Sequence, residues 1–218
     1  MTDNLPALTD KLNALPQKFG NDAFDKVAAT SFLPRIQLMT SNSQACKDGV
    51  IPMNNFAIVR GSQNIQSLGA TVDVLCLSWR PKALQIAGDE ITTLYDPDNQ
   101  VFKDIVAKAG TPNSGCMYGP EFLLWLPLQK CFVTFFMGST SARNEAANVR
   151  QYIRQPMSLR SQRLKNSKYT WYSPAAGACT TPLGCFPDET EMLAQIAAFE
   201  NPQVTQTEPV AEGEARER

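Results

Sequence analysis

The sequence contains no histidine among its 218 residues. This absence excludes catalytic triads that use histidine, histidine-ligated metals and histidine general bases. Any chemistry would have to use carboxylates, lysine, tyrosine or cysteine, so the expected function moves from catalysis toward binding. We therefore expect a binding protein that has no enzymatic activity and uses no cofactor.

Long apolar runs are also missing from the sequence. The longest, Phe122–Leu126 and Cys131–Met137, are much shorter than the roughly 20 residues that span a bilayer as a helix. The first four residues are polar and lack the basic and then apolar layout of a signal peptide. These features predict a soluble, cytoplasmic protein that makes no contact with a membrane.

The six cysteines do not follow a metal-binding pattern. No two of them are separated by two residues, and the closest pair, Cys179 and Cys185, has five residues between its members. Such spacing is not typical of zinc sites, so we expect no metal and mostly reduced thiols. The alternative is a zinc site that would use Cys46, Cys116, Cys179 and Cys185.

The length and the apolar share of 43% are enough for one well-buried domain and too little for two ordinary ones. We expect an N-terminal helical segment over residues 1–30, with helices at Leu5–Leu15 and Asp22–Ala29. Residues 31–202 are expected to form a single globular domain. Residues 203–218 have little apolar content and are predicted to be a disordered acidic tail.

Hydrophobic patterning predicts an α+β fold with mostly antiparallel strands and short peripheral helices. An elaborated five-stranded barrel of the OB type would fit this inventory, and so would an unrelated sandwich. The predicted helices of the domain are Asp98–Ala109, Ser141–Arg154 and Glu189–Phe199. The predicted strands are Phe32–Met39, Phe56–Arg60, Ala70–Trp79 (closed by Pro81), Ile91–Tyr95, Phe122–Leu126, Cys131–Met137 and Met157–Trp171. Phe122–Leu126 and Cys131–Met137 are expected to form an antiparallel hairpin, because a four-residue turn with proline at its second position joins them.

Charge is distributed unevenly along the chain, although the net charge is only −1. Between Arg143 and Lys168 there are seven cationic side chains and one acid, Glu145, and aromatic residues follow directly. After Pro187 the sign inverts, with eight acids against two arginines. Cations beside flat aromatic rings can hold phosphates and stack on exposed bases. The acidic tail can compete for the same surface or recruit partner proteins.

These features predict a nucleic-acid-binding surface made of two parts. If Met157–Trp171 is one strand, its period of two places Arg163, Lys165, Tyr169 and Trp171 on one face and Lys168 with Tyr172 on the other. A second stacking platform is predicted at Trp79, where the alternative is a tryptophan that closes the end of a barrel. The full predicted set is Trp79, Arg80, Lys82, Arg143, Arg150, Arg154, Arg160, Arg163, Lys165, Lys168, Tyr169, Trp171 and Tyr172.

Five segments together resemble a family of tailed-bacteriophage proteins that mostly have no assigned function. They are Phe32–Leu38, Leu77–Ala83, Tyr118–Trp125, Phe135–Ser139 and Tyr169–Trp171. The resemblance covers most of residues 31–202 and implies a phage setting, with the host cytoplasm as location. The basic region and acidic tail are also similar to phage single-stranded-DNA-binding proteins. Here, however, the tail ends with Glu217-Arg218 and not with a run of acids closed by an aromatic residue.

Three hypotheses follow from the sequence. The first is a phage accessory protein that binds single-stranded DNA in replication or recombination. Its expected partners are phage replication proteins, which would bind the acidic tail, and further copies of the same chain in a homo-oligomer. The second is a phage structural or assembly protein. The third is a metal-dependent nuclease that uses the stretch Asp96–Asn99 with Glu90, Asp104 or Lys103 nearby. A turn that caps the next helix also explains this stretch. The stretch Gly138–Ser141 is interpreted as an ordinary helix N-cap and not as a phosphate loop.

Overall fold

The computed structural model describes residues 33–61, 64–88, 90–179, 182–202 and 207–209. The predicted helices Leu5–Leu15 and Asp22–Ala29 lie outside these residues. The described helices are α2 (Gln44–Lys47), α3 (Gln100–Lys108), α4 (Thr140–Arg150) and α5 (Glu189–Glu200). The strands are β1 (Arg35–Leu38), β2 (Phe56–Arg60), β3 (Asn64–Gly69), β4 (Thr71–Ala87), β5 (Glu90–Leu94), β6 (Cys116–Leu126), β7 (Cys131–Phe136), β8 (Gln155–Lys165), β9 (Thr170–Ala178) and β10 (Thr207–Pro209).

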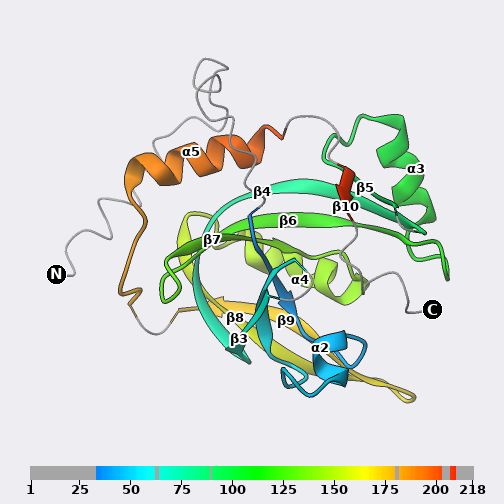
Figure 1. Cartoon of the computed structure of the whole chain (residues 1–218), viewed down its shortest axis with the longest axis horizontal. Helices are drawn as coiled ribbons and strands as arrows, with labels where there is room; N and C mark the ends of the chain where they lie inside the picture. The colour runs from blue at the N-terminus through cyan, green and yellow to red at the C-terminus, as the bar shows by residue number, and fades with distance from the viewer. Residues whose placement is uncertain (1–32, 62–63, 89, 180–181, 203–206, 210–218) are drawn as a thin grey trace.

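All ten described strands belong to one strongly curved sheet (Figure 1). Its order is β10-β5-β4-β6-β7-β1-β2-β3, with β8 pairing with β4 and β9 with β8. Every pair is antiparallel except β1 with β7. The predicted α+β class with mostly antiparallel strands is therefore confirmed. The sheet is open, and the OB-type barrel is not confirmed.

The centre of the sheet is covered on both faces, with α4 inside its curve and α5 outside (Figure 1). A strand covered on both faces needs apolar side chains on both of its sides. Strand β6 has them, because successive side chains of a strand point to opposite faces. Phe122 and Leu124 pack with α4, whereas Leu123 and Trp125 pack with α5. The antiparallel β6–β7 hairpin predicted from its two apolar runs is confirmed. Burying each such large apolar side chain contributes roughly 1.5–3 kcal/mol.

Strand β4 does not end before Pro81, so this part of the sequence prediction is wrong. The strand pairs with β8 over residues 71–76 and with β5 over residues 83–87. Pro81 lies between these two stretches and opposite Pro120 of β6. Neither β8 nor β5 pairs with β4 at this point, so the proline interrupts neither of these two pairings and the strand continues through it.

The predicted strand Met157–Trp171 is also wrong, because the chain reverses direction inside it. Asn166 makes the turn between β8 and β9. Its side-chain Oδ1 accepts hydrogen bonds from the backbone N–H groups of Lys168 (2.9 Å) and Tyr169 (2.7 Å). Asparagine side chains commonly stabilise turns in this way. The result is a two-stranded hairpin in which β8 and β9 pair antiparallel.

Smaller differences concern the ends of elements. Helix α4 stops at Arg150, four residues earlier than predicted, and Arg154 has a left-handed backbone with φ of 65°. Strand β3 and helix α2 were not predicted. Thr207–Pro209 pairs with β5 as strand β10 inside the segment predicted to be disordered. None of the helices in the described ranges is long and apolar enough to cross a membrane.

Candidate nucleic-acid interface

The β8–β9 hairpin extends away from the body of the protein, as the yellow ribbon at the lower right of Figure 1 shows. No aspartate or glutamate occurs in the sequence between Glu145 and Asp188, so the hairpin carries charge of one sign. Its four cations are exposed, and within the described residues none of them forms an ion pair. We define the hairpin interface as Arg160, Arg163, Lys165, Lys168, Tyr169, Trp171 and Tyr172.

The strand register decides which of these side chains share a face. Directly paired residues of two strands point to the same side of a sheet. Arg163 pairs with Tyr172, and Leu164 pairs with Trp171. Arg163, Lys165 and Tyr172 therefore lie on one side, which we call the first face. Arg160 and Trp171 lie on the other, which we call the second face.

The predicted grouping of Arg163, Lys165, Tyr169 and Trp171 on one face is thus wrong. It assumed an unbroken period of two, and the turn at residues 166–169 resets that period. Tyr169 lies in the turn itself and is 69% exposed, while Trp171 is 37% exposed. Together Lys168 and Tyr169 form the tip of the hairpin.

The second predicted platform is divided between the two faces of the sheet. Trp79 packs against the core on the α4 side, where the guanidinium of Arg150 lies 4.4 Å from its ring centroid. Arg80 and Lys82 point to the α5 side. Trp79 therefore occupies the position of a core-sealing aromatic, in agreement with the alternative interpretation of its sequence.

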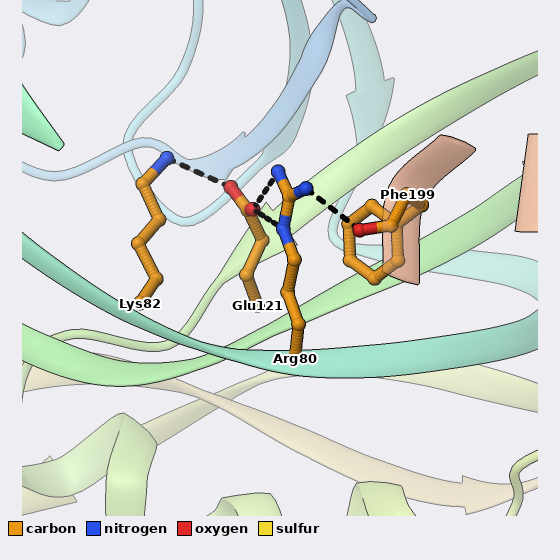
Figure 2. Close-up of polar contacts among 4 residues, drawn as sticks. All are labelled: Arg80, Lys82, Glu121 and Phe199. Atoms are coloured by element: carbon orange, nitrogen blue, oxygen red, sulfur yellow. Dashed lines mark hydrogen bonds and ion pairs between the residues drawn. The ribbon is translucent and has the colours of Figure 1, made fainter. Parts of the chain in front are cut away.

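Arg80 and Lys82 converge on the carboxylate of Glu121, as Figure 2 shows. Arg80 Nη2 lies 2.7 Å from Glu121 Oε2, and Lys82 Nζ lies 2.8 Å from Oε1. Arg80 Nη1 also donates to the backbone carbonyl of Phe199 at 2.8 Å. The same guanidinium lies between two rings, 3.6 Å from the centroid of Tyr95 and 4.1 Å from that of Phe199.

This charge cluster connects α5 to the sheet. The side chain of Glu121 is only 2% exposed, and those of Arg80 and Lys82 are 13% and 14% exposed. Phe199 is in the last turn of α5, where unpaired carbonyls give the helix a partial negative charge that a cation stabilises. Arg80 and Lys82 are therefore engaged inside the protein. In the sequence, Glu121 is the single acid of an otherwise apolar segment, and this pattern alone does not identify its partners.

Arg143 is likewise used within the protein. Its Nη1 donates to the carbonyl of Tyr118 at 3.1 Å and to that of Gly138, and its guanidinium carbon lies 4.3 Å from the Tyr118 ring centroid. The neighbouring Ser139 caps α4, since its Oγ accepts a hydrogen bond from the N–H of Ala142. The N-cap interpretation of Gly138–Ser141 is confirmed.

The acidic turn before α3 is also explained by capping. Asp96 Oδ1 accepts from the N–H of Asp98 at 2.9 Å, and Asn99 Oδ1 accepts from the N–H of Val101 at 2.8 Å. Over the described part of the chain, no three Cys, Asp or Glu side chains group as metal ligands would. Cys46 and Cys116 belong to separate apolar clusters. Burial raises the pKa of the Cys76 thiol, which therefore stays protonated.

No protein-family model, curated protein or solved structure matches this chain. The hairpin interface is therefore interpreted from its own charges, exposures and strand register. Two of its properties matter most for binding. The cations are free of acidic neighbours along the sequence, and the aromatic rings of Tyr169 and Trp171 are accessible to a flat ligand.

Trp171→Ala is expected to weaken binding to a single-stranded oligonucleotide by about 1–3 kcal/mol, the value of one stacked base. The loss should persist at high salt, because stacking does not depend on phosphate contacts. We also expect binding to quench the tryptophan fluorescence of the unmodified protein. Affinity and melting temperature are to be measured on the same variant.

Trp125→Ala provides the matched control, because Trp125 is only 5% exposed and its indole N–H donates to the carbonyl of Cys185. This change should cost about 3–5 kcal/mol of stability, as expected for a buried aromatic. The melting temperature of Trp171→Ala should stay close to that of the unmodified protein. A large drop, with tryptophan emission unchanged on adding oligonucleotide, would contradict the stacking role.

Proposed function

We propose that this chain binds single-stranded nucleic acid through the hairpin interface, as an accessory protein of phage replication or recombination. One observation carries the proposal. The protruding hairpin presents four exposed cations and accessible aromatic rings, with no acid between Glu145 and Asp188. This local charge exists in a protein of net charge −1, so it does not reflect a generally basic surface.

The two kinds of side chain would contribute different parts of the affinity. Arg and Lys neutralise phosphates and release counterions, which makes binding weaken with salt. Each phosphate contact on a single strand adds about 0.7 to the slope of log K against log salt, so four contacts predict a slope close to −3. The rings of Tyr169 and Trp171 would stack on bases with little sequence preference.

A titration of fluorescently labelled oligonucleotides tests the proposal. Single-stranded and duplex DNA and single-stranded RNA are compared at two salt concentrations, with and without Mg²⁺. We expect salt-dependent binding that favours single strands and causes no cleavage. A stable oligomer without affinity for any of these ligands would favour a structural or assembly role. Cleavage that requires Mg²⁺ would favour a nuclease.

The acids near the C-terminus give a further prediction. Replacing Glu212, Glu214 and Glu217 by glutamine is expected to strengthen binding several-fold at low salt, because these acids would compete with phosphates for the hairpin cations. The gain should disappear at high salt, where such competition is screened. Affinities at the two salt concentrations provide the measurement.

The control for this prediction makes the same change in net charge elsewhere, with Glu90→Gln, Asp104→Asn and Glu191→Gln, all of them exposed. Equal strengthening in both triple variants would show that only the total charge matters. The specific competition between tail and hairpin would then be ruled out.

A further inference from the structure

The hairpin interface presents its binding side chains on two opposite faces and at the tip. The first face carries Arg163, Lys165 and Tyr172, and the second face carries Arg160 and Trp171. Because the backbone of the ribbon lies between the faces, a single strand can contact both faces only by passing around the tip. The two faces therefore also offer separate paths for two strands.

Each face is long enough for a short piece of a nucleic-acid strand. From Arg160 to Lys165 the ribbon spans about 17 Å at roughly 3.3 Å per residue. Both faces carry cations, which can follow the backbone of an unpaired strand. The second face adds the accessible ring of Trp171, whereas Tyr172 of the first face packs against the core. At the tip, the ring of Tyr169 is the most exposed aromatic of the hairpin.

We propose that the hairpin binds the junction between a duplex and two separated strands, with one strand along each face and Tyr169 stacked on the last base pair. This inference rests on the proposed function of the hairpin interface and specifies its substrate as forked nucleic acid. The last base pair of a duplex exposes a flat surface on which an aromatic ring can stack.

Insertion of the hairpin into a duplex groove is the competing arrangement, since the major groove admits a two-stranded ribbon. Groove recognition uses hydrogen-bond donors and acceptors on the edges of stacked bases. In a groove the exposed rings of Tyr169 and Trp171 would meet phosphates and base edges, not base faces. The aromatic content of the hairpin therefore favours the fork.

The test compares five DNA ligands of equal length: a fork with two non-complementary arms, two duplexes with a single arm of opposite polarity, a single strand, and a blunt duplex. The fork is expected to bind about tenfold more tightly than the single strand, because the second arm binds at high effective concentration. A 2-aminopurine in the last base pair should change its fluorescence on binding. Tyr169→Ala should remove this change, because the stacking contact at the junction is lost. Trp171→Ala, which leaves the tip intact, should keep it.

Two charge-reversal variants show which face of the hairpin binds which arm of the fork. Arg160→Glu on the second face should cancel the contribution of one arm, and Arg163→Glu on the first face should cancel that of the arm with opposite polarity. Each variant would then bind the fork no more tightly than the corresponding one-armed ligand. If both variants weaken the same arm, the arrangement on two faces is wrong.

The remaining outcomes separate this inference from the proposed function. Equal affinity for fork and single strand would overturn the junction model and support single-strand binding. Tightest binding to the blunt duplex would overturn it in favour of groove insertion. Absence of binding to every ligand would overturn both proposals.

Discussion

Replacing Glu121 by alanine is expected to lower the free energy of unfolding by about 3–5 kcal/mol, the cost of removing one partner from a buried ion pair. The change would leave the cations of Arg80 and Lys82 without their carboxylate in a site where both side chains are mostly buried. Because Arg80 also donates to the carbonyl of Phe199, the effect should reach α5. Urea unfolding measures the free energy, and hydrogen exchange of the α5 amides reports the local loosening.

A second variant of Glu121 shows whether its charge or its shape matters, and a variant of an exposed acid provides the control. Glu121→Gln keeps the volume and removes the charge, so it should lose most of the same stability. Glu90→Gln, in an exposed acid of β5, should change stability by less than about 0.5 kcal/mol, as is usual for surface positions. A loss below about 1 kcal/mol for both Glu121 variants would show that the cluster contributes little net stability, as some buried ion pairs do.

Local patterns in the sequence predicted much of the fold correctly. The alternation and apolar runs of Phe122–Leu126 and Cys131–Met137 identified the central hairpin, because their side chains must fill both the α4 and the α5 side of the sheet. Strand Phe56–Arg60 was predicted with its observed bounds. Capping signals placed α3, where Asn99 binds the first turn and Gly110 follows the end with φ of 92°.

Errors arose where distant pairing decides the structure. Proline usually ends a strand, but Pro81 lies between the two stretches of β4 that pair with β8 and β5. No local window contains this information. The salt bridges of Glu121 join residues that are 41 and 39 positions apart in the sequence, so a lone acid gives no indication of its partners.

The candidate site was predicted by composition and not by geometry. The excess of positive charge before Lys168 predicted a cationic segment, and in the structure its last four cations, from Arg160 to Lys168, are exposed. Which side chains of this segment share a face depends on the turn at Asn166. The sequence prediction lacked this turn and therefore placed Trp171 and Tyr172 on the wrong faces. Arg80, Lys82 and Arg143 have the same residue types as the hairpin cations, yet they are held by Glu121 or by backbone carbonyls. Charge in the sequence therefore identifies candidate cations, whereas the structure separates the engaged ones from the free ones.

Reversing two charges on the first face, Arg163→Glu with Lys165→Glu, is expected to abolish measurable binding to a single-stranded oligonucleotide. Two unit charges 4 Å apart in water interact with about 1 kcal/mol, so replacing two attractions by two repulsions changes the binding free energy by up to about 4 kcal/mol. Each 1.4 kcal/mol is a factor of ten, and we expect affinity to fall about a hundredfold or more at low salt. The magnitude of the salt slope should also decrease by about 1.4, the contribution of two phosphate contacts.

The matched control makes the same change in net charge away from the hairpin, with Lys108→Glu in α3 and Lys130→Glu in the β6–β7 turn, both exposed. Its affinity should stay within a few-fold of the unmodified protein, because charges separated by more than the Debye length of about 10 Å are largely screened. A second control, Arg163→Lys with Lys165→Arg, keeps the charge and should retain most of the affinity. All four replaced residues are exposed, so the three variants should melt close to the unmodified protein. If the folded charge-reversal variant keeps its affinity and salt slope, the first face is not part of the binding site.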